Sequence, residues 1–351
     1  MKNIFGWMTQ NQVWQKVGML AVLGAAVYLI LPQINDLENS WQVVTSMALW
    51  AVGLAFIAQV LSYLGSGFLL QSILAIAHQK VSLWLNTLIV LGSYSIGMVA
   101  GGVVGNSAAI YRWTGGGKGS IEGATLASIF LPQVNSIMLV LVSIFGLVHL
   151  ILVHSLTQIQ TIGFGATLLI LGLIIGSTAL AVRFRNRAIK AVMWMSSRVA
   201  HLRRKSFDPN PIQQAAGDLF GAWDALWLGA WHRLALGAFL NMAFDLLTLY
   251  FLFVAAGENI SLGVLLAGYG LPLLLGKVAF VIPGGVGVVE SSMAVLYNGL
   301  GIPPAATVVV VLGYRLISFW IPSLTGFPIA AYLERSQWRS LKKQEVHNPI
   351  K

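Results

Sequence analysis

The chain has 351 residues, of which 57% are hydrophobic and 9% are charged, and its mean hydropathy is +0.79. A soluble globular domain carries about 25% charged residues, so this composition excludes that class and predicts an all-α polytopic membrane protein with one domain over residues 1–351. The net charge is +10, and the absence of cysteine excludes disulfides, cysteine-ligated metals and thiol catalysis.

Apolar stretches follow one another along the chain, and several reach the roughly 20 residues that cross a bilayer. We interpret the first stretch as a retained span, because Pro32-Gln33-Ile34-Asn35 offers no small-residue cleavage site after it. The stretches lie at 17–32, 43–70, 82–104, 124–151, 161–183, 228–255, 262–281, 286–300 and 304–333.

The placement of Lys and Arg predicts how these stretches are oriented. The connections 33–42, 152–160 and 256–261 contain neither residue and are expected outside, whereas Lys80 and the tail after Tyr332 are expected inside. We therefore expect a multi-pass protein of the bacterial cytoplasmic membrane with both termini in the cytoplasm.

A basic cluster marks the long connection 184–227, which we expect to be a cytoplasmic loop. Such a cluster is typical of contact with anionic membrane lipids, and we do not expect nucleic acid as a partner. The cluster comprises Arg183, Arg185, Arg187, Lys190, Arg198, Arg203, Arg204 and Lys205.

This orientation imposes a condition on two glycine-broken segments, because the chain must return to the side it left between Lys80 and Glu122 and again between 261 and 302. We expect a helical hairpin in each. The first (82–112) is anchored inside and broken around Gly97 to Gly105, and the second (262–300) is anchored outside and broken around Pro283 to Gly287. A pair of full spans in each segment satisfies the same condition.

The expected layout has about six full spans and two re-entrant hairpins in two inverted units, at about 43–151 and 228–333. A short similarity supports the repeat, because Gly101-Gly102-Val103-Val104-Gly105 and the residues up to Ala109 resemble Gly284-Gly285-Val286-Gly287-Val288 and the residues up to Ser292. Paired broken segments in two inverted halves indicate a transporter site near the membrane midplane.

The second break, Pro283-Gly284-Gly285-Val286-Gly287-Val288-Val289-Glu290, is the main candidate site. Broken backbone is tolerated at membrane depth only where protein or a water-filled cavity covers it. Lys277, Glu290 and Arg315 lie in the same apolar region, and ionisable residues there are functional candidates.

We expect the free backbone N–H groups after this break to bind an anion such as a lipid phosphate. A cation must then lie close to Glu290, with Arg315 the first choice and Lys277 the second. A purely structural Glu290–Arg315 pair that fixes the hairpin is an equally open interpretation. Asp245 is expected to be a buried partner for Lys277.

In the first unit, Asn106 and Arg112 follow the glycines, while Pro132, Gln133 and Asn135 interrupt the span 124–151. We expect these side chains to line the same cavity, although Pro132 is also explained by a packing kink. The chain has no nucleophile elbow, HExxH motif or phosphate loop, and its histidines lack ligand spacing, so no catalytic residue, metal or cofactor is predicted.

The C-terminal block resembles the lysylphosphatidylglycerol synthase transmembrane-region family, a flippase-like membrane domain of the UPF0104 type. The resemblance depends on Pro283 to Glu290, Gly301, Gly313-Tyr314-Arg315 and Trp320-Ile321-Pro322 with Gly326. The family often has a Pro-x-x-x-Gly-Glu-x-x-Arg pattern in its first half. Gly102 to Arg112 only approximates it, with Asn106 in place of a carboxylate.

The resemblance implies movement of phospholipid, including aminoacylated phosphatidylglycerol, between leaflets. The family's synthases add a soluble aminoacyl-transferase domain, which we do not expect here, so the chain is expected to be a translocase and not an enzyme. The expected partners are phospholipid headgroups, with a homodimer or a lipid-synthesising enzyme as further partners. The predicted substrate-binding residues are Asn106, Arg112, Asp245, Lys277, Pro283, Gly284, Gly285, Gly287, Glu290, Tyr314 and Arg315.

Two other functions compete with transport. An intramembrane lipid-modifying enzyme would use Glu290 or Asp245 as a base, but no nucleophile or cosubstrate site is visible. A scaffold for a synthase or glycosyltransferase would use the basic segment 183–205 as its docking surface.

Overall fold

The computed structural model describes residues 37–115, 120–153, 183–202, 231–278 and 283–347, together with isolated positions between 165 and 221. Within these residues every regular element is a helix, and five helical segments are long and apolar enough to cross a membrane. The all-α polytopic membrane class is therefore confirmed. The predicted span 17–32 and most of the predicted span 161–183 lie outside the described residues.

The helices follow the predicted apolar stretches closely, except that three stretches are divided. The stretch 43–70 is interrupted at Met47 and Ala48. The stretch 82–104 is broken at Gly101, and the stretch 304–333 contains a short π-helical turn, η4 (Leu316–Trp320). The helices are α3 (Leu37–Ser46), α4 (Leu49–Ile76), α5 (Leu83–Ala100), α6 (Val103–Gly115), α7 (Ile121–Val153), α9 (Arg185–Leu202), α11 (Trp231–Ala255), α12 (Leu262–Val278), α13 (Val288–Gly299), α14 (Pro304–Arg315) and α15 (Ile321–His347).

An antiparallel pair, α4 and α11, forms the centre of the fold. The backbones approach closely at Gly65, where an added Cβ would lie 2.6 Å from the amide nitrogen of Asn241. Asn241 Nδ2 donates to the carbonyl oxygen of Ser62 at 3.0 Å, and the Ser62 hydroxyl donates to the Asn241 carbonyl oxygen at 2.9 Å. Small residues and interhelical hydrogen bonds are the usual basis of helix association in membranes.

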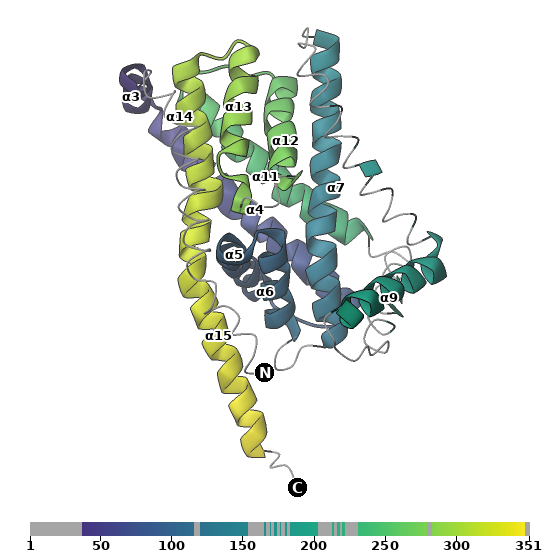
Figure 1. Ribbon diagram of the computed structural model, residues 1–351. Coiled ribbons are helices and arrows are strands. Elements are labelled where there is room, and N and C mark those ends of the chain that lie inside the picture. Colours follow the sequence, from purple (N-terminus) through teal and green to yellow (C-terminus); the bar gives the residue numbers. More distant parts are fainter. Residues whose placement is uncertain are drawn as a thin grey trace.

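Two helical hairpins lie on opposite halves of this pair, as Figure 1 shows: α5 and α6 at one end, α12 and α13 at the other. Gly101 and Gly102 have φ of 91° and 59° and reverse the first hairpin, and a 3-10 turn, η3 (Pro283–Gly285), reverses the second. With 13 and 12 residues, α6 and α13 rise only about 20 Å, less than the roughly 30 Å hydrocarbon core.

The two halves exchange contacts reciprocally. Helix α7 packs antiparallel on α12, with Gly146 against Ala267, whereas α15 packs on α5, with Gly326 against Leu91. Each unit's last helix therefore covers the other unit's hairpin, and both run past the two hairpins in Figure 1. Two units related by a two-fold axis would make such contacts in pairs, and the repeat itself stays a prediction.

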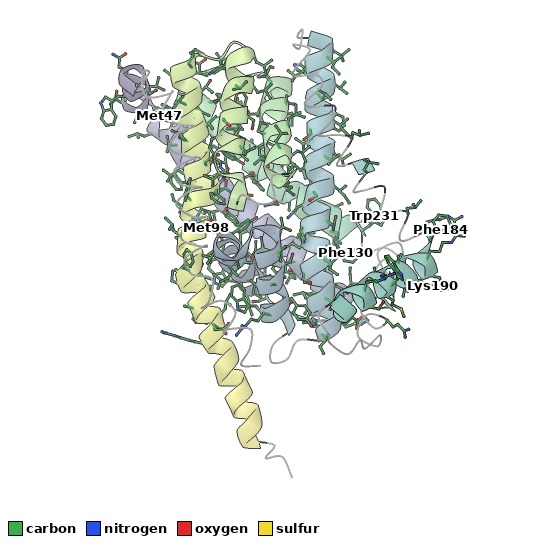
Figure 2. All side chains as sticks on the ribbon, viewed as in Figure 1. Met47, Met98, Phe130, Phe184, Lys190 and Trp231 are labelled. Atoms are coloured by element: carbon green, nitrogen blue, oxygen red, sulfur yellow. The ribbon has the colours of Figure 1, made fainter. Side chains whose placement is uncertain are left out.

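The outer faces of the helices are apolar, as expected for a lipid-facing surface, and Figure 2 shows carbon-rich side chains along them. For example, Leu49, Trp50 and Phe145 are exposed, and each lies on a helix that is long enough to span a bilayer. Inside the protein, one apolar cluster is formed mainly by side chains of α11 to α14, and another mainly by side chains of α4 to α7. The polar residues described next lie where these two clusters meet.

Candidate functional site

A cavity of about 310 Å³ lies where the tips of the two hairpins meet. The first tip contributes Gly97, Gly102 and Asn106, and the second contributes Gly284 and Gly285. Side chains from α4, α5, α6, α7, α11, α12, α13, α14 and η4 complete the wall. The polar ones are Gln59, Ser62, Tyr63, Ser66, Tyr94, Asn106, Ser107, Asn135, Asn241, Asp245, Tyr269, Lys277, Tyr314, Arg315 and Ser318.

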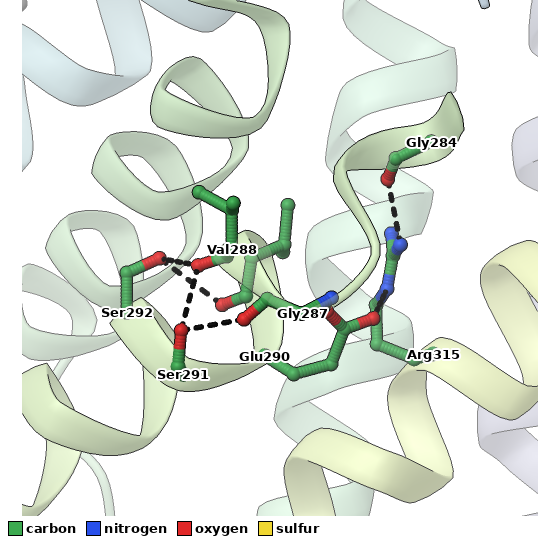
Figure 3. Close-up of polar contacts among 8 residues, drawn as sticks. Gly284, Gly287, Val288, Glu290, Ser291, Ser292 and Arg315 are labelled. Carbon is green, nitrogen blue, oxygen red and sulfur yellow. Dashed lines mark hydrogen bonds and ion pairs between the residues drawn. The ribbon is translucent and has the colours of Figure 1, made fainter. Parts of the chain in front are cut away.

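Glu290 and Arg315 form a buried ion pair beside this cavity (Figure 3). Arg315 Nε donates to Glu290 Oε1 at 2.5 Å, and the two side chains are 6% and 10% exposed. Arg315 Nη2 also donates to the Gly284 carbonyl oxygen at 2.8 Å, while Glu290 Oε2 accepts from the Gly287 amide at 2.6 Å. The pair therefore joins the break before α13 to the end of α14.

This arrangement changes the role expected for the start of α13. The sequence predicts that its free amides bind an external anion, but the carboxylate of Glu290 already accepts from the Gly287 amide. The acidic side chain acts here as the anion that a helix N-terminus favours. Arg315 lines the cavity, whereas Glu290 and Gly287 do not.

The break itself requires glycine. Gly284, Gly285 and Gly287 have φ of 65°, 62° and 87°, in the region that side chains with a Cβ disfavour. A Cβ on Gly284 would also lie 2.2 Å from Cζ of Phe319. Gly284 therefore fits against η4 because it lacks a side chain, and all three positions have a backbone conformation that favours glycine.

The π-helical turn η4 follows Arg315 directly and shapes the same wall. Its Phe319 ring stacks against the Arg315 guanidinium, whose Cζ atom lies 4.4 Å from the centroid of the ring. The Tyr63 hydroxyl on α4 donates to the Ser318 carbonyl oxygen at 2.6 Å. Single π-turns inside α-helices are frequent at functional sites, and this one binds α4 through a main-chain oxygen.

Lys277 and Asp245 both line the cavity, but the predicted ion pair between them is wrong. Lys277 Nζ donates to the Ser136 hydroxyl at 2.9 Å, and no described carboxylate lies within 4.0 Å of it. Asp245 Oδ2 accepts from the hydroxyls of Tyr269 at 2.7 Å and Tyr314 at 2.8 Å.

The helix register explains this correction. Tyr269 faces Asp245 from α12, and Lys277 comes eight residues later, about 12 Å further along that helix toward the hairpin tip. At that depth α12 packs on α7, so Lys277 reaches Ser136 instead.

The predicted residues of the first unit divide between the cavity and the surface. Asn106, Pro132 and Asn135 line the cavity, but Gln133 is exposed and does not. Arg112 was expected in the cavity and lies outside it, because α6 carries it to α15, where it pairs with Glu334. Its side chain is 58% exposed.

Several cavity residues were missed by sequence reasoning, notably Gln59, Tyr63, Tyr94 and Tyr269. Tyr63 and Tyr94 form an edge-to-face pair with ring centroids 5.9 Å apart. One signal was available, because Gln59, Ser62, Tyr63 and Ser66 recur at i, i+3, i+4 and i+7 inside an apolar span, which places them on one helix face.

Comparison with known proteins gives partial matches to UPF0104 membrane proteins. The chain is 34% identical over 98 residues to a UPF0104 membrane protein of Methanothermobacter thermautotrophicus, covering 28% of this chain and 29% of that protein. It is 35% identical over 88 residues to a UPF0104 membrane protein of Pyrococcus horikoshii, covering 25% and 26% respectively. The aligned parts thus make up less than a third of each relative's length.

A family model covers far more of the chain. The model described as the lysylphosphatidylglycerol synthase TM region matches residues 17–326. The match includes both hairpins, the central helices α4 and α11, and every charged residue of the cavity. The chain therefore belongs to the lysylphosphatidylglycerol synthase TM region family of integral membrane proteins.

Proposed function

We propose that this protein moves phospholipid between membrane leaflets as a flippase-like transporter. The observation that carries the proposal is the cavity with polar and charged walls at the meeting point of two broken hairpins. Hairpins that enter from opposite sides would leave only a short distance of membrane between two water-accessible ends. A headgroup would cross there while its acyl chains remain in lipid.

Electrostatics favours this use of the cavity. A phosphate leaving water loses hydration, and the attraction of a fixed cation grows as the local dielectric falls. Lys277 is suited to attract phosphate, because its partner is the neutral hydroxyl of Ser136. Arg315 was expected to share that role, but its guanidinium is committed to Glu290 and Gly284, so we assign it to holding the hairpin tip.

The family description connects the proposal to a lipid class. It names lysylphosphatidylglycerol synthases, and aminoacylated phosphatidylglycerol is therefore one headgroup to test. We further propose a location in the bacterial cytoplasmic membrane with cytoplasmic termini, based on the distribution of Lys and Arg.

The test is lipid movement in reconstituted vesicles. Fluorescent phospholipid in the outer leaflet is bleached by a membrane-impermeant reductant, and the bleached fraction rises when inner-leaflet lipid is moved outward. The purified chain is expected to raise this fraction above that of protein-free vesicles. Lys277→Gln is expected to slow the movement at least about tenfold, whereas Lys80→Gln, an exposed control, is expected to match the unaltered protein.

Two results would contradict the proposal. In the first, vesicles that contain correctly folded protein show the same bleached fraction as protein-free vesicles. The other is conversion of the labelled lipid into a chemically new product without movement between leaflets, which would indicate the lipid-modifying enzyme instead.

A further inference from the structure

Two opposite charges face one cavity without pairing with each other. Lys277 is bound by the Ser136 hydroxyl, and Asp245 is bound by the hydroxyls of Tyr269 and Tyr314. The cavity's other cation, Arg315, is neutralised by Glu290. Among the described lining residues, one positive and one negative charge therefore remain without an oppositely charged partner.

The hydrogen-bond partners found for Asp245 among the described residues are both neutral hydroxyls. Besides the two tyrosines, the neutral side chain of Gln59 lines the same cavity. Neutral donors hold and orient a carboxylate, but they do not cancel its charge, and an uncompensated charge away from water is costly. A cationic group of a ligand would remove that cost.

Aromatic rings line the same part of the cavity. Tyr269 and Tyr314 are edge to face with centroids 6.3 Å apart, and Tyr63 and Tyr94 form a second such pair. All four tyrosines line the cavity with Asp245. Tyrosine rings together with a carboxylate are a common environment for an ammonium group, which the rings attract through their quadrupoles.

Lys277 provides the complementary feature at the tip of the second hairpin. Its ammonium group carries three N–H donors, as a phosphate requires, and one of them donates to the Ser136 hydroxyl. Lys277 lies about 12 Å further along α12 than Tyr269, so the anionic and cationic ends of a ligand would occupy different ends of the cavity.

Building on the proposed function, we infer that the cavity binds a zwitterionic phospholipid headgroup, with its phosphate at Lys277 and its ammonium group at Asp245. An anionic headgroup such as glycerol phosphate satisfies Lys277 but leaves the charge of Asp245 unmatched. Specificity then follows from the penalty on the wrong headgroup as well as from the attraction of the right one.

Binding tests the inference without requiring transport. Full-length protein in a neutral detergent is titrated with short-chain phosphatidylethanolamine or short-chain phosphatidylglycerol, and affinities are measured by calorimetry. We expect phosphatidylethanolamine to bind about tenfold more tightly. Asp245→Asn is expected to abolish this preference, and Lys277→Gln is expected to weaken both lipids. The exposed controls Glu122→Gln and Lys80→Gln are expected to change neither.

Three results would overturn the inference. The first is equal or tighter binding of phosphatidylglycerol by the unaltered protein. The second is an Asp245→Asn variant that weakens both lipids equally. The third concerns sodium ions. If sodium raises the affinity for phosphatidylglycerol to that for phosphatidylethanolamine, and Asp245→Asn removes this increase, the carboxylate binds an inorganic cation instead of an ammonium group.

The same lipids in the vesicle assay separate this inference from the proposed function. A headgroup preference in detergent without movement in vesicles would sustain the headgroup site and contradict transport. Movement in vesicles without any headgroup preference would sustain transport and contradict the headgroup site.

Discussion

Glu290 and Arg315, 25 residues apart in sequence, are joined by a 2.5 Å hydrogen bond from Nε to Oε1 inside the protein. Each group has a second partner at the hairpin break, Gly287 for the carboxylate and Gly284 for the guanidinium. Four polar groups therefore satisfy one another where hydrocarbon would satisfy none. The ion pair closes the break that forms one side of the cavity.

Removing one partner of this pair is expected to destabilise the fold. Glu290→Gln or Arg315→Met leaves a buried charge uncompensated, a loss of about 3–5 kcal/mol. The double variant removes both charges and is expected to recover part of that loss. Thermal unfolding in detergent measures the stability of all three variants. If the stability loss of the double variant equals the sum of the two single losses, the pairing is contradicted.

Gly284→Ala is expected to destabilise the second hairpin through two separable effects. The positive φ of 65° costs about 1–2 kcal/mol, and the new Cβ would lie 2.2 Å from Phe319 Cζ. Gly301→Ala isolates the first effect, because its φ is 89° with nothing within 4 Å. Gly53→Ala, also without close neighbours and on α4, is expected to be neutral or stabilising.

The order of melting temperatures checks this prediction. Gly53→Ala is expected to be highest, followed by Gly301→Ala and then Gly284→Ala. A Gly284→Ala variant as stable as Gly301→Ala would show that the tip does not pack against Phe319 as described.

Tyr314→Phe and Tyr269→Phe each remove one hydroxyl that donates to Asp245 Oδ2. A hydrogen bond to a charged group contributes about 1.5–3 kcal/mol, so each variant is expected to lose stability in that range. The two losses are expected to be non-additive, because both donors serve one oxygen. Fully additive losses in a double-variant unfolding series would contradict a shared acceptor.

The second ion pair, Arg112 with Glu334, provides a contrast. Its side chains are 58% and 34% exposed, and exposed pairs typically contribute about 0–1 kcal/mol. Glu334→Gln is therefore expected to lower the free energy of unfolding much less than Glu290→Gln does. Equal losses in the same detergent would mean that the α6–α15 contact is as important to folding as the hairpin break.

The local features of the fold were predictable from sequence. Glycine and proline determine backbone conformation where they stand, so both breaks, at Gly101 and at Pro283 to Gly287, were found at the correct residues. Glu290 and Arg315 were paired correctly because few charges occur in that apolar region.

The partners of Asp245 and Lys277 were less accessible, because they depend on the depth at which α11, α12 and α7 pack. Tyr63, Tyr94 and Tyr269 were missed for a related reason: a tyrosine in an apolar span resembles any other core residue until its hydroxyl is located. Arg112 was misplaced because motif similarity does not tell which way α6 turns. The π-turn at 316–320 has no sequence signal that we recognise.

Blocking the cavity in a single sample tests the central claim most directly, and the absence of cysteine from the chain makes this possible. Asn106→Cys places one thiol on the cavity wall, and Glu122→Cys places one on the exposed start of α7. Each variant is labelled with a bulky disulfide-forming reagent, labelling is verified by mass spectrometry, and lipid movement is measured before and after release by reductant. We predict that labelled Asn106→Cys stops moving lipid and regains movement when reductant releases the label, while labelled Glu122→Cys moves lipid throughout. Undiminished lipid movement by fully labelled Asn106→Cys would contradict the claim that headgroups pass through this cavity.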